Sequence, residues 1–358
     1  MKSTISQPVA TSHRLAYLDI AKGIAIISIV LLHFATGFIP PNINVFISSY
    51  MISMFYVVSG WINASQQKQV PFKVLLRKRW HQLGVPYIAW TLIILTFDVI
   101  LWIFGYYDTY FIAREVYKSV VFRGIGTLWF LPALFGAEII WWWVRHKRPY
   151  LRCIVMTILV ALIVYFYGYF FGERLTLAQS IKEAPFRVIL SVATACLGVA
   201  AGFCFHRYIL KWITPGHKIV IFLIGLAIAS GGYYCALWFP YPPLWSFGAP
   251  LLGPIGIILI IMAIETSPVF SYFNYWGRNS MALMVTHFSI LMVLCDIVVR
   301  LLYGTPMKGG WIALTMFGLT MIAEYFIAEW LSKRFPRIIG RTMLPSSSQP
   351  CKNNKPNK

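Results

Sequence analysis

Charged residues are scarce in this chain, and acidic residues are the scarcest. Only 12% of the 358 residues are charged and 59% are hydrophobic, whereas soluble domains carry about 25% charged residues. The 11 acidic residues stand against 31 lysines and arginines. So few charges cannot cover the surface of a globule in water. The composition therefore excludes a soluble protein and indicates an all-α polytopic membrane protein.

Metal-binding and disulfide patterns are also missing. The six cysteines are scattered, and no two of them form a Cys-x-x-Cys pair. This spacing argues against a zinc site and against a disulfide framework, so no metal is expected. The net charge of +20 would suggest nucleic acid in a soluble domain. Here the basic residues flank apolar runs, as the positive-inside rule expects, and nucleic-acid binding is excluded.

Long apolar runs are what the chain has in abundance. About ten of them are long enough to cross a bilayer as helices. They lie near residues 17–38, 43–64, 84–106, 127–144, 151–171, 186–206, 218–239, 247–265, 280–302 and 310–331. An even number of spans places both termini on one side. The loops on that side carry most of the lysines and arginines, which predicts cytoplasmic termini.

The spans divide the chain into three parts. Residues 1–16 are predicted to form a short cytoplasmic segment, and residues 17–331 a ten-helix transmembrane domain. Residues 332–358 are basic and polar and are expected to form a cytoplasmic tail. No internal repeat and no soluble domain interrupts this plan.

The first apolar run contains three ionisable residues, Asp19, Lys22 and His33. Lys22 and His33 are eleven residues apart, which places them within about 20° on one helix face and roughly 16 Å apart along the axis. With Lys22 at a membrane surface, His33 would lie near the middle of a hydrocarbon core of about 30 Å. A histidine at that depth either transfers protons or packs against a carbonyl, and the pattern leaves both open.

Two later spans carry ionisable residues as well. Glu138 lies inside the fourth apolar run, where it should face the bundle interior as a functional or a structural group. Ser280 is expected to cap the ninth span, and His287 lies on the same face about 10 Å further along. His287 is either a polar core contact or a site residue. Asp296 and Arg300 have the i, i+4 spacing of an ion pair.

Residues 239–254 are rich in proline and glycine, which predicts an outer loop followed by a kinked or broken span. Irregular backbone at membrane depth is tolerated where protein or a cavity surrounds it. Ten spans, buried histidines and a broken helix would also suit a proton-coupled transporter or flippase of a glycan or small metabolite. The aromatic residues around 106–111 form either an interfacial belt or a platform for sugar rings.

Five short motifs follow one another in a fixed order. They are Tyr17 to Ile26 with His33 beyond it, Phe55 to Gly60, the basic run Arg77 to Arg79 leading to Pro86 and Tyr87, Leu128 to Leu131, and Gly277 to Ser280 with His287 beyond it. Together they resemble the membrane-bound acyltransferase family 3, and most of all its fucose-acetylase-like O-acetyltransferase branch. Many members carry a second arginine three or four residues before the proline, where this chain has Leu83 and Gln82.

The resemblance implies an enzyme of the bacterial cytoplasmic (inner) membrane that crosses it several times. Its donor would be cytoplasmic acetyl-CoA, used as a co-substrate with no bound cofactor. Its acceptor would be a hydroxyl of a cell-surface glycan or of a lipid-linked saccharide. Membrane lipids and polysaccharide-assembly proteins are the expected partners. Two alternatives to the enzyme remain: the transporter or flippase described above, and a non-catalytic partner of a polysaccharide synthase.

The resemblance also assigns roles to residues. His33 would be the general base, with Lys22 and Asp19 beside it in the catalytic group. The expected donor-binding residues are Arg77, Lys78, Arg79 and Ser59. The expected acceptor contacts or supporting residues are Glu138, Trp129, His287 and Ser280.

Overall fold

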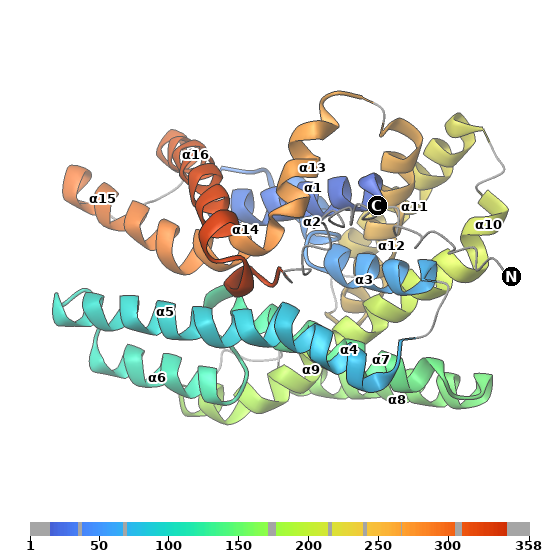
Figure 1. Cartoon of the computed structure of the whole chain (residues 1–358), viewed down its shortest axis with the longest axis horizontal. Coiled ribbons are helices and arrows are strands. Elements are labelled where there is room, and N and C mark those ends of the chain that lie inside the picture. Colours follow the sequence, from blue (N-terminus) through green and yellow to red (C-terminus); the bar gives the residue numbers. More distant parts are fainter. Residues whose placement is uncertain are drawn as a thin grey trace, which may run out of the picture.

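A computed structural model describes residues 15–34, 38–66, 70–170, 177–213, 217–238, 242–265, 267–304 and 310–341. These residues form helices and contain no strand (Figure 1). The α-helices are α1 (Ala16–Phe34), α2 (Pro41–Ser48), α3 (Ser53–Ser65), α4 (Phe72–Arg79), α5 (Val85–Ile103), α6 (Thr109–Val120), α7 (Phe130–Arg145), α8 (Pro149–Phe170), α9 (Leu177–Cys204), α10 (Leu210–Ile213), α11 (Lys218–Trp238), α12 (Pro242–Ile264), α13 (Phe270–Arg278), α14 (Ser280–Thr286), α15 (Val293–Tyr303) and α16 (Trp311–Arg334).

Five short segments have other helical geometries. Two are 3-10 turns and three are π-helical, and several continue directly into an α-helix. They are η1 (Trp80–Gly84), η2 (Gly126–Trp129), η3 (Phe205–Ile209), η4 (His287–Met292) and η5 (Pro336–Ile339).

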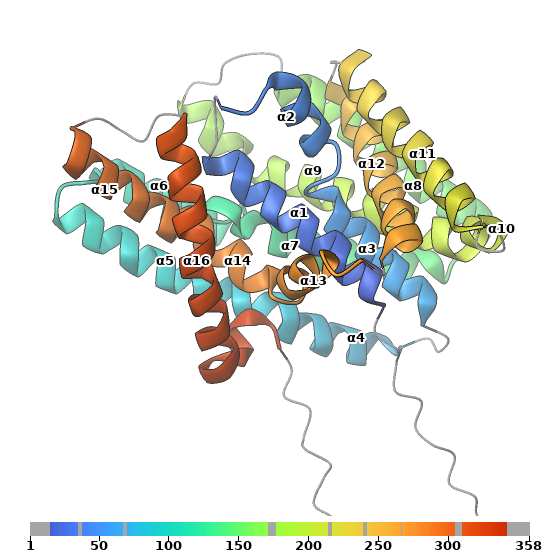
Figure 2. The ribbon, with the colours of Figure 1, turned by 90° about the horizontal axis from the view of Figure 1, so that it is seen from above.

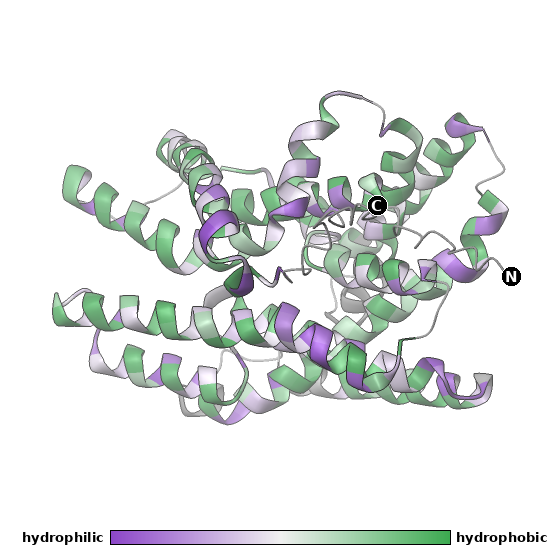
Figure 3. Ribbon diagram, viewed as in Figure 1, coloured by the Kyte–Doolittle hydropathy of each residue, from purple (hydrophilic) through white to green (hydrophobic). Residues whose placement is uncertain are grey.

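The polytopic helical fold is confirmed. Within the described residues, eight helical stretches are long and apolar enough to cross a membrane. Two shorter apolar helices, Tyr150–Ile163 and Leu251–Ile264, coincide with the other two expected spans. Most residues of the helices are hydrophobic, and hydrophilic residues gather on α4 and near helix ends (Figure 3).

Of the kinked or broken span expected at 247–265, the break is wrong, because α12 continues from Pro242 to Ile264, and the kink stays a prediction. A proline inside a membrane helix is tolerated where a neighbouring helix supports it. Helix α11 gives that support, since Gly256 lies against the backbone of Gly225 and Ala229. The outer loop expected before this span falls partly on residues 239–241, which lie outside the described residues.

Close helix crossing explains two glycines of the recognised motifs. A Cβ atom on Gly23 would lie 1.8 Å from the Phe273 carbonyl oxygen, and one on Gly277 would lie 1.7 Å from the Asp19 carbonyl oxygen. Only glycine lets α1 and α13 approach this closely. In Figure 2, α13 lies beside the first half of α1. The crossing fixes the part of α1 that carries Lys22.

The last described residues pack into the fold beyond the boundary expected at residue 331. Trp90 Nε1 donates a 2.9 Å hydrogen bond to the Ile338 carbonyl, and the Ile339 side chain is buried. Arg341 Nη2 donates a 2.7 Å hydrogen bond to Asn279 Oδ1. Since Gly277 contacts α1 near its start, both described ends of the chain lie on one side of the bundle. This side is called the terminal face below.

Candidate functional site

Two histidines from opposite ends of the chain meet inside the bundle. His33 lies in the last turn of α1, and His287 is the first residue of η4. The His33 Nδ1 atom lies 3.0 Å from the His287 Nε2 atom, and the rings are 14° from parallel. His287 is fully buried and His33 is half-buried. A π-helical turn such as η4 is frequent at functional sites. These two residues are called the histidine pair.

Hydrogen bonding fixes which ring nitrogens carry protons. His287 Nδ1 lies 2.5 Å from the Leu283 carbonyl oxygen. Because a carbonyl only accepts, Nδ1 is the protonated nitrogen of neutral His287 and Nε2 is an acceptor. His33 Nδ1 must therefore donate to His287 Nε2. The lone pair of neutral His33 is then on its own Nε2, which is the nitrogen able to accept a proton.

His33 lies in the wall of a cavity of about 270 Å³, called the apolar cavity. Among the described residues that line it, His33 alone is titratable. Most of the other walls are hydrocarbon or aromatic. They include Ile26, Ile29, Met51, Ile52, Phe55 and Phe130. The walls around His33 therefore offer few hydrogen-bonding groups besides His33 itself.

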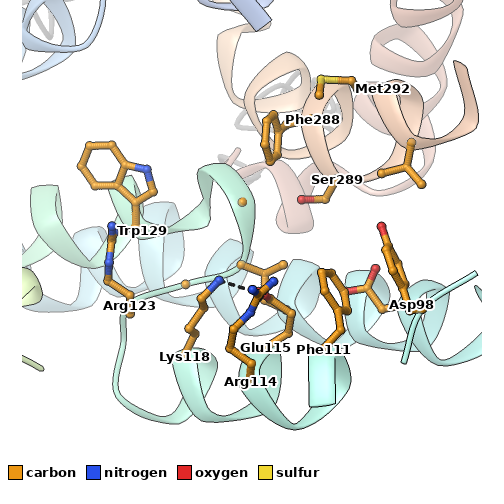
Figure 4. A pocket seen from close by; sticks show the side chains of 15 residues that line it. Asp98, Phe111, Arg114, Glu115, Lys118, Arg123, Trp129, Phe288, Ser289 and Met292 are labelled. Carbon is orange, nitrogen blue, oxygen red and sulfur yellow. Dashed lines mark hydrogen bonds and ion pairs between the residues drawn. The ribbon is translucent and has the colours of Figure 1, made fainter. Parts of the chain in front are cut away.

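A larger cavity of about 480 Å³ adjoins the apolar cavity and is called the polar cavity (Figure 4). The two cavities share Gly126, Trp129 and Phe288 in their walls. Gly126 has a φ of +52°, and a Cβ atom there would lie 2.3 Å from Ser289 Oγ. Any other residue at 126 would thus fill the space where the two cavities meet.

Charged groups line the polar cavity. Glu115 is buried and pairs with Arg114 at 2.9 Å and with Lys118 at 2.8 Å. Asp98 on α5 is also buried, and its Oδ2 atom has no hydrogen-bond partner among the described residues. In Figure 4, the α6 side chains lie on one side of the cavity, opposite Ser289.

Aromatic rings complete the polar cavity. The rings of Tyr107 and Phe111 stack with centroids 3.9 Å apart. The Arg123 guanidinium lies 5.9 Å from the centre of the Trp129 ring. The segment predicted from sequence as an aromatic belt or sugar platform thus contributes two residues, Tyr107 and Phe111, to a cavity wall.

A second buried polar group forms around Glu138 on α7. Arg79 Nε lies 2.8 Å from Glu138 Oε2, and Arg79 Nη2 lies 2.7 Å from Oε1. Ser59 Oγ donates to Oε1, and Asn63 Nδ2 lies 3.5 Å from Oε2. Two residues expected to bind the donor therefore meet one expected to act in support. These four residues are called the Glu138 cluster.

The remaining predicted residues lie on or near the terminal face. Lys22 Nζ forms a 2.8 Å ion pair with Asp19 Oδ1, and the Lys22 side chain is 20% exposed. Arg77 and Lys78 are exposed on α4. No ion pair of these two is found among the described residues. Arg77 and Lys78, two of the residues expected to bind the donor, are therefore accessible, whereas Arg79 is paired with Glu138.

Helix periodicity links these groups to the histidine pair. On α1, Ile26 and Ile29 occupy the face between Lys22 and His33 and line the apolar cavity. On α3, Ser59 follows Phe55 of that cavity by one turn, and on α7 Glu138 follows Phe130 by eight residues, about 12 Å.

The direction of this path is also set by a contact. Trp61 on α3 donates a 3.1 Å hydrogen bond to Tyr17 at the start of α1. The Glu138 cluster and Lys22 therefore lie on the same side of the apolar cavity, toward the terminal face.

Ser280 is placed differently from expectation. It is the first residue of α14, and Asn279 holds the capping position, so the predicted Ser280 cap is wrong. Asn279 accepts from Arg341, and its own amide donates to the Tyr275 carbonyl. The chain turns within one residue between α13 and α14, which leaves no room for a serine cap. Ser280 lines neither cavity, whereas Trp129 lines both.

Three buried carboxylates beside the polar cavity or the histidine pair were not predicted from the sequence. Asp98 and Glu115 line the polar cavity. Glu324 on α16 accepts a 2.6 Å hydrogen bond from Thr286, the residue before His287. Asp98 and Glu324 lie in apolar runs, so the depth argument that identified Glu138 also applies to them. The predicted Asp296 and Arg300 pair is confirmed, at 2.6 Å.

The fold and this site define a multi-pass helical membrane protein with a hydrogen-bonded histidine pair beside two joined cavities. A family model described as an acyltransferase domain, that of acyltransferase family 3, matches residues 15–329. The chain belongs to this family and is a membrane acyltransferase. The matched region contains all five motifs and both cavities. Comparison with curated proteins and with solved structures finds no match.

Proposed function

We propose that this membrane acyltransferase transfers an acetyl group from acetyl-CoA to a hydroxyl of a cell-surface glycan or its lipid-linked precursor, with His33 as general base. One observation carries the proposal. The proton-accepting nitrogen of His33 belongs to a histidine pair in the wall of the apolar cavity, and the polar cavity adjoins that cavity. The acetyl donor and the fucose-acetylase-like branch rest on the motif resemblance.

The proposed step is a direct acyl transfer. His33 Nε2 accepts the hydroxyl proton while the hydroxyl oxygen attacks the thioester carbonyl carbon. A C–O bond forms, the C–S bond breaks, and CoA leaves as a thiolate that takes the proton back from His33. A sugar hydroxyl has a pKa far above 7, so this attack needs a general base.

His287 would act as a positioning residue. Its Nε2 atom accepts the hydrogen bond from His33 Nδ1, and its own Nδ1–H is anchored on the Leu283 carbonyl. This chain orients the His33 ring and stabilises the positive charge that His33 gains. His33 would thus be a base that is oriented by a second residue, His287, which is itself held by the Leu283 carbonyl.

The donor would enter from the terminal face. Lys22, Arg77 and Lys78 supply accessible positive charge there for the CoA phosphates. The aliphatic part of CoA would follow the faces of α1 and α3 into the apolar cavity, whose hydrocarbon walls suit it. Arg79 and Ser59 would contribute indirectly, because both contact Glu138 and hold it in place beside this path.

The acceptor would occupy the polar cavity. Its volume of about 480 Å³ is within the usual range for small-molecule pockets. The Asp98 carboxylate can accept hydrogen bonds from sugar hydroxyls. The Tyr107, Phe111 and Trp129 rings offer flat apolar faces for a sugar ring. The hydroxyl would reach His33 past Gly126.

The same proposal places the terminal face in the cytoplasm of a bacterium, with the polar cavity reached from the other side. Labelling of single cysteines in intact cells tests this orientation. A Lys78→Cys variant is expected to resist a membrane-impermeant thiol reagent until the cells are opened. Labelling of this variant in intact cells would show that the terminal face lies outside the cytoplasm.

An assay with purified protein, labelled acetyl-CoA and a glycan acceptor tests the reaction. Label on the glycan is expected, and it should vanish in His33→Gln. Movement of the glycan across a vesicle membrane without label would instead indicate a carrier. If neither is seen, the chain would be a non-catalytic partner of a polysaccharide synthase.

A further inference from the structure

A third cavity of about 220 Å³ lies between α6 and α9 and is called the basic pocket. It shares Arg114, Lys118 and Arg123 with the polar cavity, and α9 adds Arg187. Glu115 pairs with Arg114 and Lys118, and Glu183 pairs with Arg187 at 3.2 Å. Four cations therefore meet two carboxylates in and beside this pocket.

Arg123 differs from the other three cations of the basic pocket, each of which has a carboxylate partner. Its backbone is held at the end of α6 by a 2.8 Å hydrogen bond to the Lys118 carbonyl. Its guanidinium lies over the Trp129 ring and has no carboxylate partner among the described residues. Burial and the nearby Arg187 guanidinium both lower the pKa of Arg123, so both disfavour its charge. A bound anion would offset that cost.

An open groove of about 350 Å³ lies directly beside the basic pocket and is called the apolar groove. Phe122 and Val188 line it, and their chain neighbours Arg123 and Arg187 line the basic pocket. The Tyr87 ring packs on Phe122 with centroids 6.0 Å apart. The other walls are almost entirely apolar. They include Trp80, Leu83, Ile88, Leu131 and Phe135.

We propose that the basic pocket binds the phosphate linkage of a lipid-linked saccharide acceptor, with the saccharide in the polar cavity and the lipid chain in the apolar groove. This inference rests on the proposed function. A polar head, an anionic linkage and an apolar chain occur in this order in such a molecule. The polar cavity, the basic pocket and the apolar groove occur in the same order in the protein.

The geometry also explains how such an acceptor is oriented. Arginine binds phosphate oxygens through two parallel N–H groups, which fixes direction as well as adding affinity. With the phosphate on Arg123 and Arg187, the saccharide extends toward Trp129 and Gly126, the residues nearest the apolar cavity. A sugar hydroxyl is thereby directed to His33, while the lipid chain stays in the groove.

Binding of three probes to the purified full-length protein in detergent tests the proposal. The probes are farnesyl diphosphate, inorganic pyrophosphate and farnesol, measured by titration calorimetry. Farnesyl diphosphate is expected to bind more tightly than pyrophosphate. Arg123→Gln should weaken its binding by on the order of ten- to a hundredfold, the effect of losing a charged hydrogen bond. Farnesol binding should not change.

Matched variants separate the site from general charge effects. Arg123→Lys keeps the charge and is expected to lose less affinity, and Arg187→Gln should repeat the loss. Arg334→Gln removes an exposed arginine of the terminal face and should leave binding unchanged. Unchanged melting temperatures establish that the variants are folded.

Three results would overturn the proposal. Pyrophosphate binding as tightly as farnesyl diphosphate would mean a soluble anion, not a lipid. Full affinity for farnesyl diphosphate in both Arg123→Gln and Arg187→Gln would show that the basic pocket is not the phosphate-binding site. Equal weakening by Arg334→Gln would mean non-specific attraction. None of these measurements needs acyl transfer, and His33→Gln should bind farnesyl diphosphate normally, so failure of the proposed reaction is recognised separately.

Discussion

The histidine pair and the Glu138 cluster both lie inside the bundle, and both join segments distant in sequence. In the Glu138 cluster, a carboxylate is saturated by Arg79, Ser59 and Asn63. In the histidine pair, two neutral rings form a chain that ends on a backbone carbonyl at one side and a cavity at the other. A carboxylate paired with a cation holds helices in place, whereas a neutral imidazole in a cavity wall can accept a proton on its unprotonated nitrogen. The proposed function therefore places the chemistry at the histidine pair and gives the Glu138 cluster a structural role.

The largest expected effect comes from His33→Gln. Glutamine can form hydrogen bonds but cannot take up the hydroxyl proton. The rate of acyl transfer should fall by on the order of a hundred- to ten-thousandfold, with the melting temperature nearly unchanged. Turnover per folded molecule and thermal unfolding are the measurements. Near-normal turnover would show that His33 is not the general base and would favour His287 for that role. A large loss of stability would show that His33 is a packing residue.

Glu138→Gln should mainly lower the stability of the protein, whereas His33→Gln mainly lowers the rate. Removing the carboxylate leaves the partly buried Arg79 guanidinium without its ion pair. The free energy of unfolding should fall by about 3 kcal/mol, as for other broken buried pairs. Thermal unfolding in detergent measures this.

The control is the double variant Glu138→Gln with Arg79→Gln. It should recover much of the lost stability, because no charge is then left unpaired. If the double variant is as unstable as the sum of the single variants, the two residues are not coupled.

His287→Gln tests the inner member of the histidine pair. It removes the ring that stabilises protonated His33, so the maximal rate should fall by on the order of ten- to a hundredfold. The KM for acetyl-CoA should stay the same, and the pH dependence of the rate should shift. A loss as large as that of His33→Gln with an unchanged pH profile would show that the two histidines do not act as base and support.

The smallest effect is expected for Lys22→Ala. Loss of one partly exposed cation should raise the KM for acetyl-CoA by about fivefold, and Lys22→Arg should raise it less. Lys333→Ala is the matched control, since Lys333 also pairs with an acid on its own helix, Glu329 at 3.2 Å. Equal KM values for all variants would leave Lys22 as a topological charge only.

Much of the fold follows from local features of the chain. Hydropathy located the spans because each helix must be apolar over the thickness of the membrane. For residues 247–265 the same local features predicted a kinked or broken span, and the break is wrong. Helix α12 stays continuous because α11 packs closely against it through Gly225 and Gly256. Whether a proline breaks a helix depends on that neighbour.

The sequence predicted many of the residues of the candidate site, but it did not predict which of them contact one another. Depth and motif spacing identified His33, His287, Glu138 and Arg79. They did not identify Asp98, which lies in an apolar run and lines the polar cavity. The donor-binding role expected for Arg79 stays a prediction, and its ion pair with Glu138 was not foreseen.

Hydropathy and the 3.6-residue period act over a few turns, so they were enough to predict the membrane class, the helices and the order of residues along each helix. Which helix faces meet depends on contacts between segments that are far apart in the sequence. The bond between His33 and His287 joins residues 254 positions apart. It depends on the close crossing of α1 and α13 at Gly23 and Gly277 and on the widened turn at η4. No local pattern encodes that pairing, since it results from packing all the helices together.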